Sequence, residues 1–341
     1  MKLRAVVVIL GFLAGASCAR LKPNVTLLPC ESPEAQAASQ LALDFINGQN
    51  THGYKYALNQ IEEFQLITKP DGTEVYLLEL EFYETKCHVL DPTPLPQCKV
   101  RPKIETAIEA DCDVALTKAG DLFLVAAFKC KTETEKDRCV GCPRLRPLND
   151  TNGAHLVQAS LDHFNKNHSL NAAFVLLEVG RVSSQVVSGG AKYKAEYAII
   201  ETNCTSSAND ICAPLNHTVA RHGFCHTEGS GAYMKVGCDI FVPPPPPVDP
   251  VTNATLPAPP TVLLHAHTGG PGFTPEIHSL THHKLTAFHD PNAISVLSES
   301  DSFEAASIVK REVVADAPPA VSQTAGKQLL VAICPAKKIH F

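Results

Sequence analysis

Hydrophobic positions recur at helical spacing in two stretches of the chain. In the first stretch, Ser32 and Pro33 suit the start of a helix. Its apolar positions at helical spacing are Ala37, Leu41, Ala42, Phe45 and Ile46. A later stretch shows the same period. Its apolar positions are Leu156, Val157, Leu161 and Phe164. The pattern therefore predicts two amphipathic helices, one in each half of the chain.

Strand-like apolar runs follow each predicted helix. They cover residues 74–83 and 122–128 after the first helix, and residues 174–179 and 194–200 after the second. One helix followed by several antiparallel strands indicates an α+β module in which the helix packs on one face of the sheet.

The cysteines and short motifs repeat in the same register. Leu43-Asp44-x-x-Asn47 recurs as Leu161-Asp162-x-x-Asn165. Twelve of the 13 cysteines follow Cys18, and eight of them form two sets of similar spacing. The sets are Cys87, Cys98, Cys112, Cys130 and Cys204, Cys212, Cys225, Cys238. Two unrelated domains would not keep this register, so we infer two copies of one disulfide-bonded module.

The first residues have the pattern of a secretory signal peptide. Basic residues precede an apolar run at residues 5–14, and small residues lead to a cleavage site near Cys18. The run is too short to cross a bilayer of about 30 Å, and no later run approaches the required length. We assign residues 1–18 to the signal and expect a secreted, extracellular protein without a membrane anchor. The alternative is a lipoprotein signal, but Gly15 stands where it needs a branched apolar residue.

Composition agrees with export. The even number of cysteines after the signal suits an oxidising compartment, and six N-x-S/T sequons predict surface glycans. They begin at Asn24, Asn149, Asn167, Asn203, Asn216 and Asn253. The net charge of −6 provides no basic surface for nucleic acid.

From Pro243 the chain becomes rich in proline, alanine, glycine and histidine. We expect residues 243–341 to form a largely disordered tail that docks back through Cys334, with a dibasic processing site at Lys310 and Arg311. Its histidines are potential Zn²⁺ or Cu²⁺ ligands, but a flexible segment offers no fixed geometry, so no metal site is assigned. They include His265, His267, His278, His282, His283 and His289.

One motif links the chain to a known family. Gln185-Val186-Val187-Ser188-Gly189 precedes a strand-like run and matches the Q-x-V-x-G hairpin that marks the cystatins. With the doubled cysteine frame, the chain resembles the multidomain plasma branch of the cystatin superfamily. Further segments are similar to the fetuin family, in its fetuin-A branch, and the resemblance covers essentially the whole chain. These segments are Thr85–Pro94, Asp111–Asp113, Cys139–Pro143 and Pro147–Thr151.

The resemblance implies two tandem cystatin-like domains, each a helix packed on an antiparallel sheet. They span residues 20–136 and 143–242, with a Cys-x-x-Cys linker at residues 137–142. Spacing alone leaves the disulfide pairing open, because twelve cysteines allow thousands of combinations. The family pattern implies Cys30–Cys334, Cys87–Cys98, Cys112–Cys130, Cys139–Cys142, Cys204–Cys212 and Cys225–Cys238.

The resemblance also implies that the protein binds calcium phosphate mineral and inhibits its precipitation. Strand alternation places Glu79 and Glu81 on one face, roughly 6.5–7 Å apart. Such a row suits a lattice of calcium ions, which prefer oxygen ligands. The alternative is a strand face that is charged only for solubility. Glu105, Glu109, Asp111, Asp113 and Asp121 are expected to extend the row.

The Gln185–Gly189 hairpin supports a second hypothesis, the inhibition of papain-like cysteine proteases by a cystatin wedge. Gly189 suits a tight turn close to an enzyme, and Val186 and Val187 stiffen the strand before it. The alternative is an ordinary β-hairpin without a partner. The second hairpin, at residues 227–233, lacks the tryptophan that usually anchors such inhibitors. In the first module, residues 65–72 do not match the motif.

The Cys139-x-x-Cys142 pair is expected to be a small structural disulfide rather than a redox or zinc motif. Fetuin-B-like proteins inhibit metalloproteases through this linker with an acidic residue beside the second cysteine. Here Val140 and Gly141 occupy the positions between the cysteines, so we rank metalloprotease inhibition last. No nucleophile, base and orienting group form a recognisable set, so we predict that the protein is not an enzyme and needs no cofactor.

Overall fold

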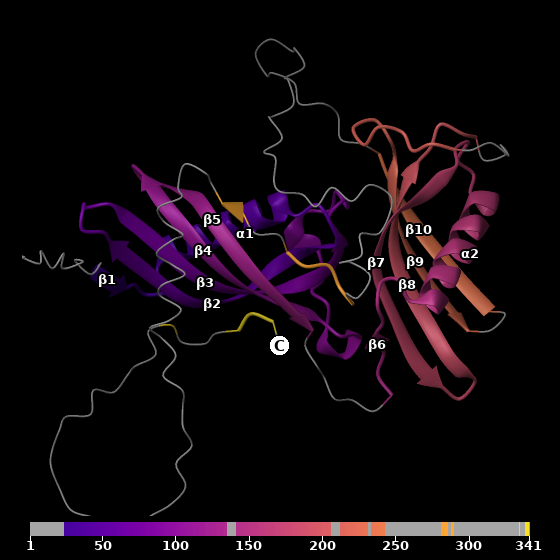
Figure 1. Cartoon of the computed structure of the whole chain (residues 1–341), viewed down its shortest axis with the longest axis horizontal. Helices are drawn as coiled ribbons and strands as arrows, with labels where there is room; N and C mark the ends of the chain where they lie inside the picture. Colours follow the sequence, from indigo (N-terminus) through magenta and orange to yellow (C-terminus); the bar gives the residue numbers. More distant parts are fainter. Residues whose placement is uncertain are drawn as a thin grey trace, which may run out of the picture.

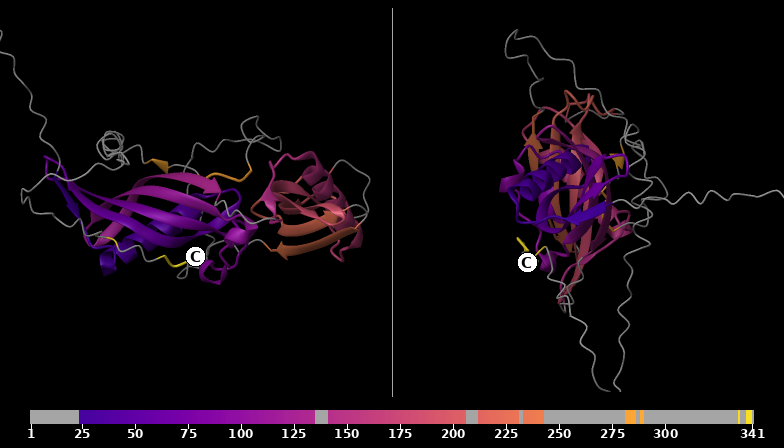
Figure 2. Two further views of the ribbon diagram at one scale, coloured as in Figure 1. Left: turned by 90° about the horizontal axis from the view of Figure 1, so that it is seen from below. Right: turned by 90° about the vertical axis from the view of Figure 1, so that its left-hand side faces the viewer.

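The computed structural model describes two modules that lie end to end, each with one helix against an antiparallel sheet (Figures 1 and 2). The described residues are 24–134, 141–205, 212–230, 233–242, 281–285, 288–289, 334 and 338–340. The predicted α+β architecture is confirmed. No helix among the described residues is long and apolar enough to cross a membrane.

The first module contains α1 and a sheet of strand order β1-β2-β3-β4-β5-β11. Two short 3₁₀ turns, η1 and η2, lie between β3 and β4. The elements are β1 Asn24–Leu27, α1 Pro33–Gln49, β2 Tyr54–Thr68, β3 Glu74–His88, η1 Leu95–Gln97, η2 Lys103–Glu105, β4 Ile108–Ala119, β5 Leu122–Thr134 and β11 Phe288–His289.

The second module contains α2 and a sheet of strand order β10-β9-β8-β7-β6. Its elements are β6 Arg144–Leu145, α2 Thr151–Asn167, β7 Phe174–Val187, β8 Gly190–Glu201, β9 His222–Ser230 and β10 Tyr233–Phe241. At the start of α2 the backbone comes very close to the sheet. A Cβ on Gly153 would lie 2.6 Å from Cγ1 of Val182, so the glycine permits this packing.

Helix α1 begins as the sequence predicts and buries part of the predicted apolar stripe. The Ser32 hydroxyl accepts a hydrogen bond from the Ala35 amide at 3.1 Å. Ala38 and Ala42 face the sheet, whereas Leu41 is exposed. Ala37 is also exposed. Of the predicted apolar positions, Ala42 and Ile46 are buried and Phe45 packs against the core. The buried face includes Ala35 and Ala38 in place of Ala37 and Leu41.

The repeated L-D-x-x-N motif has one structural function in both modules. Asn47 at the end of α1 donates to the Tyr56 carbonyl and accepts from the Tyr56 amide, both at 2.8 Å. Asn165 in α2 makes the same two contacts with Phe174, at 2.8 and 3.0 Å. Each asparagine thus joins the end of its helix to an early position in the first long strand, β2 or β7.

The disulfides within each module join neighbouring elements, and one bond closes the chain. Among the described residues, the structure forms Cys30–Cys334, Cys87–Cys98, Cys112–Cys130, Cys204–Cys212 and Cys225–Cys238. Cys142 is also disulfide-bonded, but Cys139, its expected partner, lies outside the described residues. So do the signal peptide, Asn253, the Lys310–Arg311 pair, His265, His267 and His278.

Residues 281–285 and 288–289 belong to the predicted tail and pack on the two modules. Leu285 is buried in the core of the first module. His282 and His283 bond the Thr132 and Val179 carbonyls, at 3.3 and 2.9 Å, and so contact both modules. A buried leucine anchors this segment, which the polar tail composition did not indicate.

A buried cluster of charges joins the modules. Glu84 on β3 accepts from Arg101 at 2.8 Å and from Arg181 on β7 at 3.0 Å. Arg101 also binds both carboxylate oxygens of Glu196 on β8, and Tyr54 donates to the same carboxylate. Burial alone would raise the pKa of Glu196, but the charge and hydrogen bonds of Arg101 outweigh it and lower that pKa to about 2.

A second carboxylate, Glu178 on β7, reinforces this interface. It accepts from the Gly53 amide at 2.7 Å and from His52 at 2.6 Å, and His88 lies 3.2 Å away. Burial opposes its charge, but the hydrogen bonds from His52 and His88 hold the pKa of Glu178 well below its usual range. The interface is therefore polar, and the carboxylates of Glu178 and Glu196 are ionised at neutral pH.

We expect Glu84→Gln to destabilise the protein strongly, because it leaves two buried arginines without their shared carboxylate. Breaking a buried pair in this way costs about 3–5 kcal/mol. Urea denaturation measures the change in the free energy of unfolding. The control is Glu228→Gln, which removes a more exposed partner of Lys192 at 3.1 Å and should cost less than about 1 kcal/mol. If Glu84→Gln and Glu228→Gln lower the free energy of unfolding equally, the buried cluster does not stabilise the contact between the modules.

Candidate functional site

Carboxylates gather on the outward face of β2, β3 and β4, which we call the acidic face. Strand pairing places Glu63, Glu79 and Asp113 opposite one another across the three strands. The next row pairs Glu81 with Asp111. Directly opposite side chains lie about 4.5–5.5 Å apart at Cβ, and like charges there repel. The acidic face consists of Glu62, Glu63, Glu79, Glu81, Glu109, Asp111 and Asp113.

Sequence reasoning missed Glu62 and Glu63. A register shift between Ile61 and Glu63 interrupts the alternation of β2. The charges of Asp111, Glu81 and Asp113 act on Glu62, which places it within their field. Two consecutive glutamates between the buried Ile61 and Phe64 are the signal that indicates such a bulge.

Crowding of like charges changes the titration of Glu79. Its tip is exposed, but loss of solvation on the crowded strand, followed by the charges of Glu63 and Asp113, raises its pKa to about 7. The pKa values of Glu62 and Asp111 are raised as well, first by loss of solvation and then by neighbouring carboxylates. A bound cation would relieve this repulsion.

The acidic face is open and bordered by lysines rather than closed around one ion. Lys129 and Lys131 on β5 lie opposite Asp113 and Asp111. Within the described part of the chain, no three or more His, Cys, Asp or Glu side chains are arranged to hold a metal ion. The arrangement therefore suits contact with an extended array of cations better than chelation of one.

Three of the expected carboxylates are placed differently from the prediction. Glu81 lies on the outward face but is only 1% exposed, because residues 338–340 cover it. Glu105 is in η2 at the module interface, where it pairs with Lys86 at 2.7 Å. Asp121 lies in the turn between β4 and β5, beyond the paired strands. Glu81 and Glu105 contact segments that lie apart from their own in sequence, which strand alternation does not reveal.

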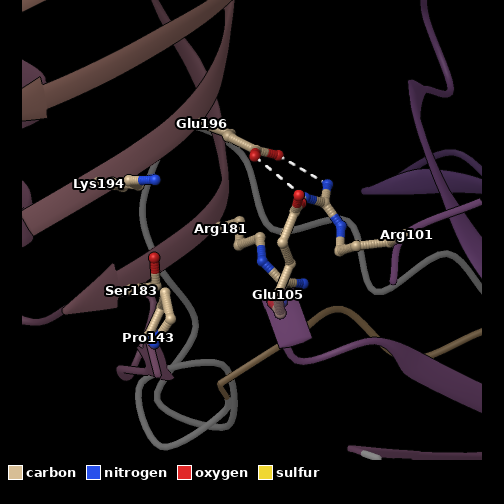
Figure 3. Close-up of a pocket in the computed structure, with 7 residues that line it drawn as sticks. All are labelled: Arg101, Glu105, Pro143, Arg181, Ser183, Lys194 and Glu196. Carbon is tan, nitrogen blue, oxygen red and sulfur yellow. Dashed lines mark hydrogen bonds and ion pairs between the residues drawn. The ribbon is translucent and has the colours of Figure 1, made fainter. Parts of the chain in front are cut away.

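A cavity of about 120 Å³ lies beside Glu105 at the junction of the modules (Figure 3). Figure 3 shows Arg101 bonded to Glu196 across it, with Ser183 and Lys194 on the side of the second module. Its arginines are already paired with carboxylates. The cavity is therefore part of the interface.

The Q-x-V-x-G motif forms the exposed hairpin between β7 and β8. Val187 pairs with Gly190, so Ser188 and Gly189 form the turn. Val186 is 82% exposed at the tip. The left-handed backbone lies at Gly190, with φ of 110°, and not at Gly189, where the sequence predicted the special turn residue.

Two further segments lie at the same end of the second sheet. Gln185 donates to the Gly141 carbonyl at 2.7 Å, which holds the linker beside the hairpin. Gly229 near the end of β9 pairs with Tyr193 on β8, so the end of β9 lies near the first hairpin. Tyr233, the first residue of β10, pairs with Ser230 at the end of β9 and is 62% exposed. Sequence reasoning emphasised the absence of tryptophan and overlooked this tyrosine, whose signal is an aromatic residue next to a hairpin turn.

The described sequon asparagines are all exposed. Four belong to the second module and one to the edge strand β1 of the first. They are Asn149, Asn167, Asn203 and Asn216, together with Asn24.

Comparison with known proteins identifies the family. A model of the cystatin domain matches residues 141–230. Alpha-2-HS-glycoprotein of mouse is 32% identical over 333 residues, covering 92% of this chain and 91% of the relative. The human protein of that name is 33% identical over 262 residues, covering 72% of this chain and 71% of the relative. The chain belongs to the alpha-2-HS-glycoprotein (fetuin-A) family.

Solved fetuin-B structures share the fold of this fetuin-A relative. Mouse fetuin-B is 24% identical with a TM-score of 0.53, covering 65% of this chain and 71% of that chain. Mouse fetuin-B in an inhibitory complex with human meprin beta is also 24% identical, with a TM-score of 0.54. The match covers 64% of this chain and 75% of that chain. This likeness supports the tandem arrangement of the two modules.

We expect Glu63→Gln to lower the pKa of Glu79 clearly below 7, because it removes the strongest neighbouring negative charge. The pH titration of the Glu79 side-chain carboxyl carbon by NMR measures this value. Glu74→Gln changes an exposed carboxylate at the start of the same strand and should leave the titration unchanged. An unaltered midpoint in Glu63→Gln would show that the two carboxylates do not interact.

Proposed function

We propose that this fetuin-A relative is a secreted glycoprotein that binds nascent calcium phosphate on its acidic face and inhibits its precipitation. The observation that carries the proposal is the row Glu63, Glu79 and Asp113 across three hydrogen-bonded strands. Strands lie about 4.8 Å apart, and same-face positions along one strand roughly 6.5–7 Å apart. The carboxylates thus form a two-dimensional array on a rigid support.

Electrostatic repulsion among the carboxylates of the acidic face favours the binding of calcium. Loss of solvation and then repulsion by Glu63 and Asp113 raise the pKa of Glu79, so the negative charge of Glu79 is unfavourable in the protein alone. A divalent ion between opposing carboxylates removes this repulsion and receives the oxygen ligands that calcium prefers. The activity is binding, and it requires no catalytic group or cofactor.

The position of the sequons supports a colloidal role. Four of the described sequon asparagines lie in the second module, while the acidic face belongs to the first. With its acidic face on mineral, the protein would direct glycans on the second module toward water. This arrangement would separate mineral-bearing particles.

We expect Glu79→Gln, Asp111→Asn and Asp113→Asn together to remove more than about half of the precipitation delay, because calcium binding depends on the local carboxylate field. The delay is measured by light scattering in supersaturated calcium phosphate. Glu81 is left unchanged because it is buried.

The matched control removes three exposed carboxylates elsewhere: Asp44→Asn, Asp162→Asn and Asp239→Asn. This control should behave as wild type. If both triple variants lose equal activity, net charge rather than the acidic face causes the delay. If wild type itself causes no delay, the protein does not have this function.

A second candidate function is inhibition of a papain-like cysteine protease by the second module. The exposed Val186 and Tyr233 favour it, since they place apolar side chains on two neighbouring hairpins. Gln185 ties the linker to the same edge. Together these segments form a preorganised wedge, which would limit the entropy lost on binding.

Metalloprotease inhibition ranks below both functions. Fetuin-B of mouse has been solved with human meprin beta and with crayfish astacin. In this chain Val140 and Gly141 stand in the linker, without the acidic residue expected of such an inhibitor.

We expect the full-length protein to inhibit papain, and Gly189→Glu to raise the inhibition constant about 30-fold or more. A charge on the hairpin tip disrupts an apolar contact worth about 2 kcal/mol. Val219→Glu is the control, because Val219 is 64% exposed and lies outside the hairpins. Equal inhibition by all three proteins would exclude the hairpin as the wedge. No inhibition by wild type at micromolar concentration would exclude the function.

A further inference from the structure

Residues 338–340 lie against the acidic face beside β2 and β3 (Figure 1, yellow). A register shift between Leu58 and Gln60 leaves Asn59 outside the β2–β3 pairing. Residues 339 and 340 form hydrogen bonds with Asn59 at this position. The Ile339 amide donates to the Asn59 carbonyl at 3.0 Å, and the His340 amide donates to Asn59 Oδ1 at 2.6 Å. The bulge thus provides a docking point for a segment distant in sequence.

The docked segment places a cation among the carboxylates. Lys338 Nζ lies 3.2 Å from Glu81 Oε1, which also accepts from Asn59 Nδ2 at 3.0 Å. Burial opposes the charge of Glu81, but the contacts with Lys338 and Asn59 outweigh it and lower the pKa. The charge of Lys338 also acts on Glu62 and Asp111. Lys338 therefore serves as a counter-ion for this half of the acidic face.

We propose that the segment Lys338–His340 is a displaceable cover of the acidic face, and that calcium competes with Lys338 for Glu81. This inference rests on the proposed calcium binding and adds its regulation. The cover blocks one carboxylate of the array, and its displacement adds Glu81 to the surface available to calcium.

Two features make the cover reversible. Its contacts are limited, since Lys338 retains 45% exposure of its side chain and Ile339 is 61% exposed. Because the Lys338 ammonium group remains accessible to solvent, salt ions can screen its charge. The bond Cys30–Cys334 anchors the chain four residues before Lys338. The tether keeps the local concentration of the segment high, so the cover can dock again when calcium leaves.

The first test compares calcium affinity in full-length proteins by calorimetry at constant ionic strength. We expect Lys338→Gln to bind calcium about fivefold more tightly, because it removes the competing charge. Lys129→Gln removes a lysine that faces Asp113 on the same sheet but does not belong to the cover. We expect a smaller gain from this control, and equal gains would overturn the inference in favour of simple net charge.

The second test follows hydrogen exchange at the Ile339 and His340 amides of wild type. Saturating calcium should accelerate exchange at both amides, while sodium chloride of equal ionic strength should not. Protection that persists at saturating calcium would overturn the inference and leave the proposed function intact. If neither wild type nor Lys338→Gln binds calcium, the proposed function fails, and this inference fails with it.

Discussion

The shared carboxylate of Glu84 is the interaction on which the arrangement of the two modules depends. It receives a guanidinium from each side, Arg101 of the first module and Arg181 of the second. Buried charges are tolerated only when geometry and hydrogen bonds compensate for lost hydration. A change in the angle between the modules would leave one arginine unpaired. The cluster therefore favours one orientation more by excluding alternatives than by adding net stability.

The acidic face shows the opposite use of charge. At the interface, opposite charges are paired and buried, whereas Glu63, Glu79 and Asp113 are like charges held together by strand register. Backbone hydrogen bonds and the apolar core beneath the sheet hold them there despite their repulsion. Loss of solvation and, after it, this repulsion raise the pKa of Glu79. Cations from solution can stabilise such a surface. At one end of the acidic face, Lys338 of the same chain provides the positive charge that a bound cation would provide.

Duplication gave both modules the same frame and left their surfaces free to diverge. Asn47 and Asn165 make equivalent contacts, and paired disulfides occupy equivalent strands. The first module presents carboxylates on its sheet, while the second presents exposed apolar residues on its hairpins. The carboxylates of the first sheet and the apolar hairpin residues of the second tolerate substitution, because neither group belongs to the core between helix and sheet.

Local patterns in the sequence predicted the elements of each module. The helical start at Ser32, the strand face of Glu79 and Glu81, and the Gln185–Gly189 hairpin all depend on neighbours close along the chain. The cysteine repeat also indicated the duplication, and the family resemblance supplied the pairing that spacing left open. These features are readable because capping and strand alternation are short-range effects.

Tertiary structure alone decided which of these residues meet. It buried Glu81 beneath Lys338, which is 257 residues away, and drew Glu105 into the module interface. It also placed Leu285 in the first core and brought Glu62 and Glu63 to the acidic face. Periodicity describes the direction of a side chain on its own strand, but not which distant segment covers it. Burial, charge pairing and pKa depend on that cover, so only the folded chain determines them.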